Sequence, residues 1–308
     1  MASEQVTVFA PGTTANVGPG FDCLGMAFSG MGDRVTARRV PGGEVRVVSV
    51  SDARIPLDPE RNTAAIAARS VLRRAGLANV GLELEITKGL PLSGGMGGSA
   101  ASAAAGAVAA DAIAGSRLDK LQLVEAAMDA EAVVAGRHAD NVAPSVLGGA
   151  VVIVGIDPLT IASVRVHPEI ELVMVTPAYG VETQRARSVL PRDIPRADAI
   201  AQAAHLAGLV LGLERGDHGL IARSMVDRNA EPARAVLYPG YPQAKEAGMA
   251  AGAIGVVVSG AGPTIIALTS PDATANVASA MQKAYSLAGF ESHAHRASVD
   301  NAGARLIG

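Results

Sequence analysis

Cysteine, net charge and long apolar runs are all scarce in this sequence. The single cysteine, Cys23, excludes an intrachain disulfide and a zinc site built from cysteines, and it fits a reducing, cytoplasmic environment. The formal net charge of −3 argues against nucleic acid or an anionic membrane as the main partner. The longest run of small apolar residues, 100–114, contains Asp111 and is too short to span a bilayer. No basic stretch followed by an apolar core begins the chain, so we expect no signal peptide.

Length and apolar content predict two domains of the α+β class. The chain has 308 residues, of which 49% are hydrophobic, so it can bury more than one core. The pattern breaks around Asp157 and Pro158, so we expect an N-terminal domain over 1–160 and a C-terminal domain over 161–308. Strands predicted beside helices in both halves indicate α+β sandwiches.

Hydrophobic periodicity predicts the order of the elements. In the first half it predicts an antiparallel unit with strands over 5–10, 34–40 and 44–50, and further strands over 80–87 and 146–155. We predict helices over 58–76 and 118–136, and loops over 10–22 and 138–145. The second half is predicted to contain strands over 171–177, 255–259 and 264–269, three or four helices between 182 and 252, a helix over 272–289 and a last strand.

The most informative stretch is 91–102, Pro-Leu-Ser-Gly-Gly-Met-Gly-Gly-Ser-Ala-Ala-Ser. Its glycines allow positive φ angles and a close approach of the backbone to a ligand. The small, helix-favouring residues from Ser99 onward predict a helix that begins at or just before Ser99. The next acidic residue is Asp111, so no side chain in the first turn compensates the free N–H groups and the positive end of the dipole. This combination predicts a phosphate cradle.

Other interpretations of these glycines compete with a phosphate cradle. A P-loop is excluded because no Gly-Lys-Ser/Thr follows them. Residues 95–100 match the loose dinucleotide pattern G-x-G-x-x-A, with Asp119 at the acidic position. That match is weak, because the preceding strand alternates and residues 88–93 separate it from the glycines. A flexible glycine loop without a ligand is the remaining alternative.

Three glycine-containing segments, 11–25, 91–102 and 259–264, together resemble the motifs of the GHMP superfamily of galactokinases, homoserine kinases, mevalonate kinases and phosphomevalonate kinases. Their order and spacing are similar, and the resemblance covers the whole chain. The second motif of that family is typically P-x-G-x-G-L-G-S-S-A-A. This sequence keeps Ser99 but has Ser93, Gly94, Met96 and Gly98 where Gly, Ser, Leu and Ser are usual. The resemblance implies the two-domain GHMP kinase fold, with an N-terminal ribosomal-protein-S5-like domain and a C-terminal ferredoxin-like α/β sandwich.

Within that superfamily the sequence most resembles the homoserine kinases. The resemblance rests on residues 13–25, on Gly-Arg-His-Ala-Asp-Asn-Val-Ala-Pro over 136–144, and on Glu-Pro-Ala-Arg over 231–234. Sugar and mevalonate kinases usually carry a catalytic Asp in the central loop, whereas this chain has the homoserine-type His-x-Asp-Asn. The resemblance implies ATP-dependent phosphorylation of the hydroxyl of L-homoserine, a step toward threonine.

The same resemblance implies residues for ATP and Mg²⁺. Phosphoryl transfer needs a phosphate cradle, a Mg²⁺ ion and a positioned hydroxyl, and Mg²⁺ prefers a carboxylate with a hydroxyl or water. Ser99 and Glu131 resemble the metal-binding and catalytic pair. On residue type alone, Glu131 could be a solvated acid and Asn62 a helix cap. The residues implied in nucleotide binding are Asn62, Lys88, Pro91, Leu92, Ser93, Gly94, Gly95, Met96, Gly97, Gly98, Ser99, Ala100 and Ala101.

Homoserine carries an ammonium, a carboxylate and a hydroxyl, and each needs a partner of matching chemistry. We expect Asp22 to bind the ammonium, and Arg187 with Arg234 to bind the carboxylate. The remaining contacts are expected from Asn16, His138 and Asn141. The plainer alternatives are solvated surface charges for the arginines and a packed loop residue for His138. Because both arginines lie in the second half and the cradle in the first, we expect a cleft between domains.

The substrate proton raises a separate question, because an Asn amide is no base near neutral pH. We expect Asn16 and Asn141 to orient the hydroxyl while the γ-phosphate receives the proton. Asp140 and Asp22 are the competing bases, although Asp140 could simply brace its loop. Two alternative functions stay open: a sister GHMP kinase for another alcohol, and a catalytically silent nucleotide-binding member. The oligomeric state also stays open, with a homodimer among the candidates.

Overall fold

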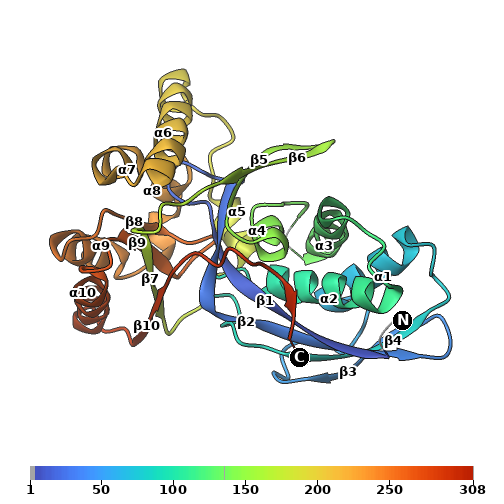
Figure 1. The fold of residues 1–308 in the computed structure, drawn as a ribbon. Coiled ribbons are helices and arrows are strands. Elements are labelled where there is room, and N and C mark those ends of the chain that lie inside the picture. Colours follow the sequence, from blue (N-terminus) through green and yellow to red (C-terminus); the bar gives the residue numbers. More distant parts are fainter. Residues whose placement is uncertain (1–3, 135, 308) are drawn as a thin grey trace.

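The computed structural model describes residues 4–134 and 136–307, which form two β-sheets with helices packed against them (Figure 1). The first sheet has seven strands in the order β11-β1-β2-β4-β3, with β5 pairing with one end of β2 and with β6. Its strands are β1 (Gln5–Ala15), β2 (Leu24–Val40), β3 (Val45–Val50), β4 (Gly81–Thr87), β5 (Ala150–Ile156), β6 (Leu159–Val164) and β11 (Arg305–Leu306). The helices that accompany it are α1 (Thr63–Arg74), α2 (Gly98–Ala114), α3 (Lys120–Val134) and α4 (Val142–Leu147).

The second sheet has four antiparallel strands in the order β10-β7-β9-β8. They are β7 (Glu171–Pro177), β8 (Gly255–Val258), β9 (Ile265–Thr269) and β10 (Ser292–Ala297). Helices α9 and α10 contact each other and this sheet, while α6 and α7 pair with each other. The helices of this half are α5 (Thr183–Ser188), α6 (Arg196–Arg215), α7 (His218–Ser224), α8 (Ala230–Arg234), α9 (Tyr241–Ala250) and α10 (Thr274–Leu287), with a 3-10 turn over Ala235–Leu237. The predicted α+β class is confirmed.

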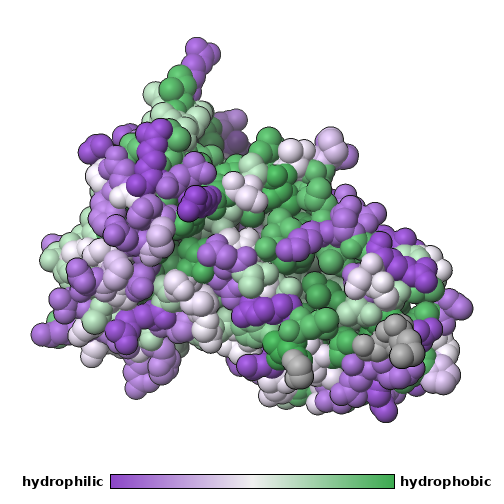
Figure 2. Space-filling model, viewed as in Figure 1, coloured by the Kyte–Doolittle hydropathy of each residue, from purple (hydrophilic) through white to green (hydrophobic). Residues whose placement is uncertain are grey.

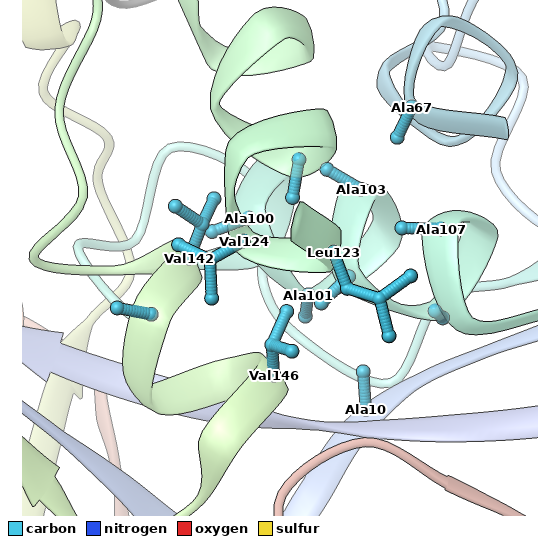
Figure 3. Close-up of a cluster of buried hydrophobic side chains, with 14 of the residues drawn as sticks. Ala10, Ala67, Ala100, Ala101, Ala103, Ala107, Leu123, Val124, Val142 and Val146 are labelled. Carbon is cyan, nitrogen blue, oxygen red and sulfur yellow. The ribbon is translucent and has the colours of Figure 1, made fainter. Parts of the chain in front are cut away.

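Helix α2 is the centre of the first half. It contacts strands β1 and β2 on one side and helices α1, α3 and α4 on the others. Figure 3 shows its alanines, among them Ala100, Ala103 and Ala107, facing side chains of these neighbours, and all three are fully buried. Because neighbours cover the helix nearly all round, only small side chains fit between it and them. Packing therefore demands the alanine-rich composition that also favours the helix.

Several predicted element boundaries are wrong where pairing depends on distant segments. The loop predicted over 10–22 is strand as far as Ala15, because a register shift between Pro11 and Thr13 accommodates the proline that lacks an N–H. β3 does not pair antiparallel with β2; it runs parallel to β4, which takes the central position. The reason is burial, since the inward residues of β4, such as Leu84, are fully buried, whereas half of the residues of β3 are exposed.

Two short elements also differ from the prediction. Residues 138–145 are not all loop, because α4 begins at Val142. Between 182 and 252 there are five α-helices, not three or four.

The first sheet extends through β6 to Val164, and β11 returns to pair with β1, so residues 305–306 join the N-terminal sheet. The boundary expected near residue 160 therefore does not divide the two sheets cleanly.

On the face shown in Figure 2, apolar residues gather in the middle of an otherwise largely polar surface. Figure 2 shows hydrophobic residues gathered over the β5–β6 hairpin and helices α2 to α4, while hydrophilic residues cover most of the second half on this face. Exposed apolar side chains of that region include Val133 and Val154. Within residues 4–134 and 136–307, no helix combines the length and apolarity needed to cross a membrane.

The contact between α1 and α2 yields a test of the packing. A Cβ at Gly106 would lie 2.4 Å from the carbonyl oxygen and 2.8 Å from the Cα of Ala64, so α1 would have to move. We expect Gly106→Ala to lower the free energy of unfolding by about 1–3 kcal/mol through overpacking, although alanine is the better helix former.

The matched control for that substitution is Gly219→Ala in α7, which is exposed and whose Cβ would meet only side-chain atoms, Nη1 of Arg223 at 3.3 Å and Oδ1 of Asp217 at 3.4 Å. There we expect no loss, or a gain of up to about 1 kcal/mol from helix propensity. Urea unfolding of both variants measures the difference. Equal stabilities for the two would contradict close packing between α1 and α2.

Candidate active site

A cavity of about 370 Å³ lies between the two halves and contains most of the predicted site residues. Its lining includes Asn16, Asn62, Lys88, Pro91, Leu92, Ser93, Gly94, Gly95, Gly97, Gly98, Ser99, Glu131, His138, Asn141, Arg187 and Arg234. Asp22 is not in the lining but its carboxylate pairs with Arg187. Met96, Ala100 and Ala101 are buried in the core, and their side chains do not line the cavity.

The prediction for the start of α2 is confirmed. The helix begins at Gly98, and its cap residue Gly97 has φ 67° and makes no side-chain cap bond. Its first turn has no acidic residue. The N–H groups there are free to meet an anion from outside, and the helix dipole favours one.

Two glycines of the cradle cannot carry a side chain. A Cβ at Gly97 would fall 2.0 Å from Oγ1 of Thr13, and one at Gly95 would fall 2.4 Å from the carbonyl oxygen of Ser259. Both also have positive φ, which disfavours any L side chain. The glycines therefore let the first and third motifs contact the second directly.

Hydrogen bonds then join the three motifs. The Ser259 hydroxyl donates to the carbonyl of Gly95 at 2.7 Å, and its oxygen also forms a hydrogen bond with the Thr14 hydroxyl at 2.9 Å. The Gly260 N–H donates to the carbonyl of Ala15 at 2.8 Å. The cradle is thus braced from the second sheet, which explains why a motif about 160 residues later in the chain belongs to the same site.

Lys88 and Asn62 line the cavity, but both side chains already have partners. The Lys88 ammonium forms an ion pair with Asp33 and donates to the Gly98 carbonyl at 2.7 Å and to Oγ of Ser102 at 3.0 Å. Oδ1 of Asn62 accepts from the N–H groups of residues 64 and 65, so Asn62 caps α1. Asp33 and Ser102 were missed by the sequence analysis.

Glu131 on α3 has the properties of a metal ligand. Its side chain is buried, and Oε1 has no hydrogen-bond partner in the described structure. Burial raises its pKa to about 7, while Ser99 and Lys88 act in the opposite direction. A carboxylate oxygen without a partner beside a serine hydroxyl fits the few protein ligands that Mg²⁺ takes. No cluster of three or more His, Cys, Asp or Glu that could hold a metal occurs in residues 4–134 and 136–307.

The loop after β1 carries the acidic end of the site. Asn16 and Asp22 both have φ near +57°, at 58° and 56°, and the Asp22 N–H donates to Oδ1 of Asn16 at 2.7 Å. The Asp22 carboxylate accepts two hydrogen bonds from Arg187, at 2.6 and 3.1 Å. Asp22, expected to bind the substrate ammonium, and Arg187, expected to bind the substrate carboxylate, are therefore paired with each other here.

The two arginines come together around one aromatic ring. The guanidinium carbons of Arg187 and Arg234 lie 5.6 and 5.0 Å from the centre of the Phe21 ring, a residue the sequence analysis did not single out. Arg234 is buried, and it donates from Nε to the Ala186 carbonyl at 2.8 Å and from Nη1 to the Gly260 carbonyl at 3.2 Å. Burial lowers its pKa. Neither arginine is the solvated surface charge that residue type alone suggests.

The His-x-Asp-Asn segment, residues 138–141, also lines the cavity. Thr13 donates to Oδ1 of Asn141 at 2.9 Å, which leaves the amide NH₂ for other partners. Nδ1 of His138 lies 3.8 Å from Oδ1 of Asp22, and burial lowers the His138 pKa. Asp140 is buried with Oδ1 unpartnered in the described structure, and burial, followed by the Asp22 charge, raises its pKa to about 7.

These two raised pKa values predict a pH-dependent stability. Between about pH 4.5 and pH 7 the unfolded chain has released the protons of Glu131 and Asp140, whereas the folded chain keeps them. The free energy of unfolding from these groups must therefore fall as pH rises, by up to about 1.4 kcal/mol per pH unit for each carboxyl. A double variant with Glu131→Gln and Asp140→Asn should lose this pH-dependent part of the free energy of unfolding.

We expect the difference in unfolding free energy, variant minus wild type, to grow more positive from pH 5 to pH 7.5. Urea titrations in EDTA without nucleotide measure it, and the subtraction cancels His138 and other groups common to both proteins. A difference that stays constant with pH would show that neither carboxyl keeps its proton in the folded protein.

The whole chain is similar to known kinases. The family model for the GHMP kinases N terminal domain matches residues 62–149, and the one for the GHMP kinases C terminal domain matches residues 209–287. A homoserine kinase of Arabidopsis thaliana is 40% identical over 313 residues, covering 98% of this chain and 85% of that protein. One from Xanthomonas campestris is 40% identical over 314 residues, covering 99% and 94%.

Solved structures give the same assignment. The crystal structure of homoserine kinase from Cytophaga hutchinsonii superposes with a TM-score of 0.95 at 39% identity, covering 100% of this chain and 98% of that one. The L. major mevalonate kinase, at 15% identity and a TM-score of 0.70, shares the fold. Identity near 40% over whole chains, together with both family models, establishes the family. The chain belongs to the GHMP kinases, and within them to the homoserine kinase family.

Proposed function

We propose that this protein transfers the γ-phosphoryl group of ATP to the side-chain hydroxyl of L-homoserine, giving O-phospho-L-homoserine for threonine biosynthesis. The observation that carries the proposal is one cavity lined both by the phosphate cradle at α2 and by the arginines beside Phe21. A phosphate-binding end and a carboxylate-binding end in one cavity match the two substrates of an amino-acid kinase.

At the ATP end, the backbone does most of the binding. The first turn of α2 offers N–H groups to the phosphates, and the glycines before it permit close approach. Ser99 and Glu131 would hold Mg²⁺, and the unpartnered Oε1 of Glu131 supports this role. When bound, Mg²⁺ supplies positive charge that offsets the charge developing on the transferred group.

At the homoserine end, the Asp22–Arg187 ion pair matches the charges of the substrate. A zwitterion can exchange this one pair for two, with its ammonium on Asp22 and its carboxylate on Arg187. Nε of Arg187 is buried without a partner in the described structure, so it remains as a donor. Arg234, anchored by two backbone carbonyls, adds a second positive charge in a fixed place.

The substrate panel that tests the proposal uses two fragments of homoserine. ADP release should be rapid with homoserine and slow with 3-aminopropan-1-ol, which lacks the carboxylate, and with 4-hydroxybutanoate, which lacks the ammonium. Mevalonate and shikimate should not be phosphorylated. Preferred turnover of mevalonate would favour a sister kinase, and no turnover of any alcohol would favour a silent nucleotide-binding protein.

In the same assay, Arg187→Gln should raise KM for homoserine by about tenfold or more and leave KM for ATP nearly unchanged, because a bidentate contact to the acceptor is lost. The slow reaction of 3-aminopropan-1-ol is the internal control, since it has no carboxylate to lose. If its KM rises as much as that of homoserine, Arg187 does not bind the carboxylate.

For the proton, we propose that Asn16 and Asn141 orient the hydroxyl and that the γ-phosphate accepts its proton. Asp140 is the competing base, because its pKa of about 7 suits proton transfer at neutral pH. Asp140→Asn should keep kcat within about threefold and leave the acidic limb of its pH profile in place. A loss of about a hundredfold or more, with homoserine binding intact and the acidic limb gone, would identify Asp140 as the base.

A further inference from the structure

Asp33 is a charged residue at a core position of β2. Side chains alternate along the strand, and Asp33 lies on the same buried face as Val35 and Ala37, with its side chain 0% exposed. The pairing of Arg34 with Thr87 continues by one step to set Asp33 opposite Lys88, just beyond the end of β4. An isolated carboxylate there would be costly to bury, so the ion pair with Lys88 is what allows it.

The ion pair is part of a closed network beneath the phosphate cradle. A lysine ammonium has three N–H donors, and those of Lys88 meet Asp33, the Gly98 carbonyl at 2.7 Å and the Ser102 hydroxyl at 3.0 Å. The Ser102 hydroxyl donates to Oδ2 of Asp33 at 2.6 Å, and the Gly89 N–H donates to Oδ1 at 3.0 Å. The Lys88 side chain is only 6% exposed.

Stability alone does not account for this arrangement. Apolar residues of similar size usually stabilise a core at least as well as a buried ion pair does. The network instead joins three segments at one point: β2, the turn after β4, and the first turn of α2. Gly98 and Ser102 lie one helical turn apart on α2. Because it contacts both, the Lys88 ammonium fixes the rotation of α2 about its axis and its position along that axis, at the N-terminus that faces the cavity.

We propose that Asp33 is a positioning residue for nucleotide binding, which holds the Lys88 ammonium against Gly98 and Ser102 and thereby fixes the phosphate cradle. Lys88 then acts on the nucleotide through the shape of the cradle and not as a direct phosphate ligand. This inference rests on the proposed function only in that the cradle binds the phosphates of ATP. It assigns a role to Asp33 and Ser102 and changes the one expected for Lys88.

The two possible roles of Lys88 predict opposite effects for Asp33→Asn. If Lys88 is held for positioning, removing the Asp33 charge releases it from Gly98 and Ser102, and the cradle loses its shape. If Lys88 binds phosphate directly, the same change frees a positive charge beside the cradle, and ATP binding stays the same or becomes tighter.

The experiment measures ATP binding in Mg²⁺ by calorimetry without homoserine, and KM for each substrate by ADP release. For Asp33→Asn we expect the Kd and KM for ATP to rise about tenfold or more, while KM for homoserine changes less than about threefold. Ser102→Ala should shift ATP binding in the same direction by a few fold. Because it removes only one hydroxyl, it gives a second reading if Asp33→Asn fails to fold.

The matched control is Glu83→Gln, which removes the carboxylate of the exposed Arg38–Glu83 pair between the same two strands. It should leave the Kd for ATP and the KM for each substrate unchanged. Unchanged or tighter ATP binding by Asp33→Asn, or by Ser102→Ala where the former does not fold, would overturn the proposal, as would equal losses for ATP and homoserine. The proposed function is judged separately, by turnover of homoserine in the wild-type protein, since ATP binding is measured without it.

Discussion

One constraint governs this structure: the N-terminus of α2 must reach the cavity with free N–H groups while the rest of the helix stays in the core. The helix is covered by β1, β2, α1, α3 and α4, so its side chains must be small. The same coverage gives the helix no room to shift when a ligand arrives. If this end binds the phosphates of ATP as proposed, a cradle built on a buried helix would need little ordering on binding.

Three of the five buried side-chain atoms without a hydrogen-bond partner in the described structure belong to residues that line the cavity. In the described structure, Oε1 of Glu131, Oδ1 of Asp140 and Nε of Arg187 are buried and unpaired, and all three residues line the cavity. Such groups destabilise the folded state, and burial accordingly raises the pKa of both carboxyls. The apolar core around α2 offsets this cost. Local rules of stability are broken where ligands are expected to complete the hydrogen bonds, as is usual for functional sites.

The sequence predicts features that depend on neighbouring residues and misses those set by distant pairing. The start of α2 follows from local composition, and the structure has it at Gly98. The course of β1 past Pro11, the parallel β3–β4 pair and the return of β11 depend on segments far apart in the chain, which periodicity cannot identify. Asp33 was missed because the strand was predicted from Arg34 onward; one residue more would have put a charge in register with Val35. The site residues were predicted from motif resemblance, and only the structure shows that both arginines lie close to the Phe21 ring.

The carbonyl of Gly260 links the two halves at the end of the cavity that contains the arginines. The Gly260 oxygen accepts from Nδ2 of Asn16 at 3.0 Å and from Nη1 of Arg234 at 3.2 Å, so one atom of the third motif ties the first-half loop to the second-half arginine. The Gly260 N–H, in turn, donates to the carbonyl of Ala15 at the end of β1. Because Gly260 has φ 59°, both groups of this residue can be used at once in a turn that other residues rarely adopt. Hydrogen bonds within the protein therefore set the distance between the cradle and the two arginines, and under the proposed function this distance would select substrates by their length.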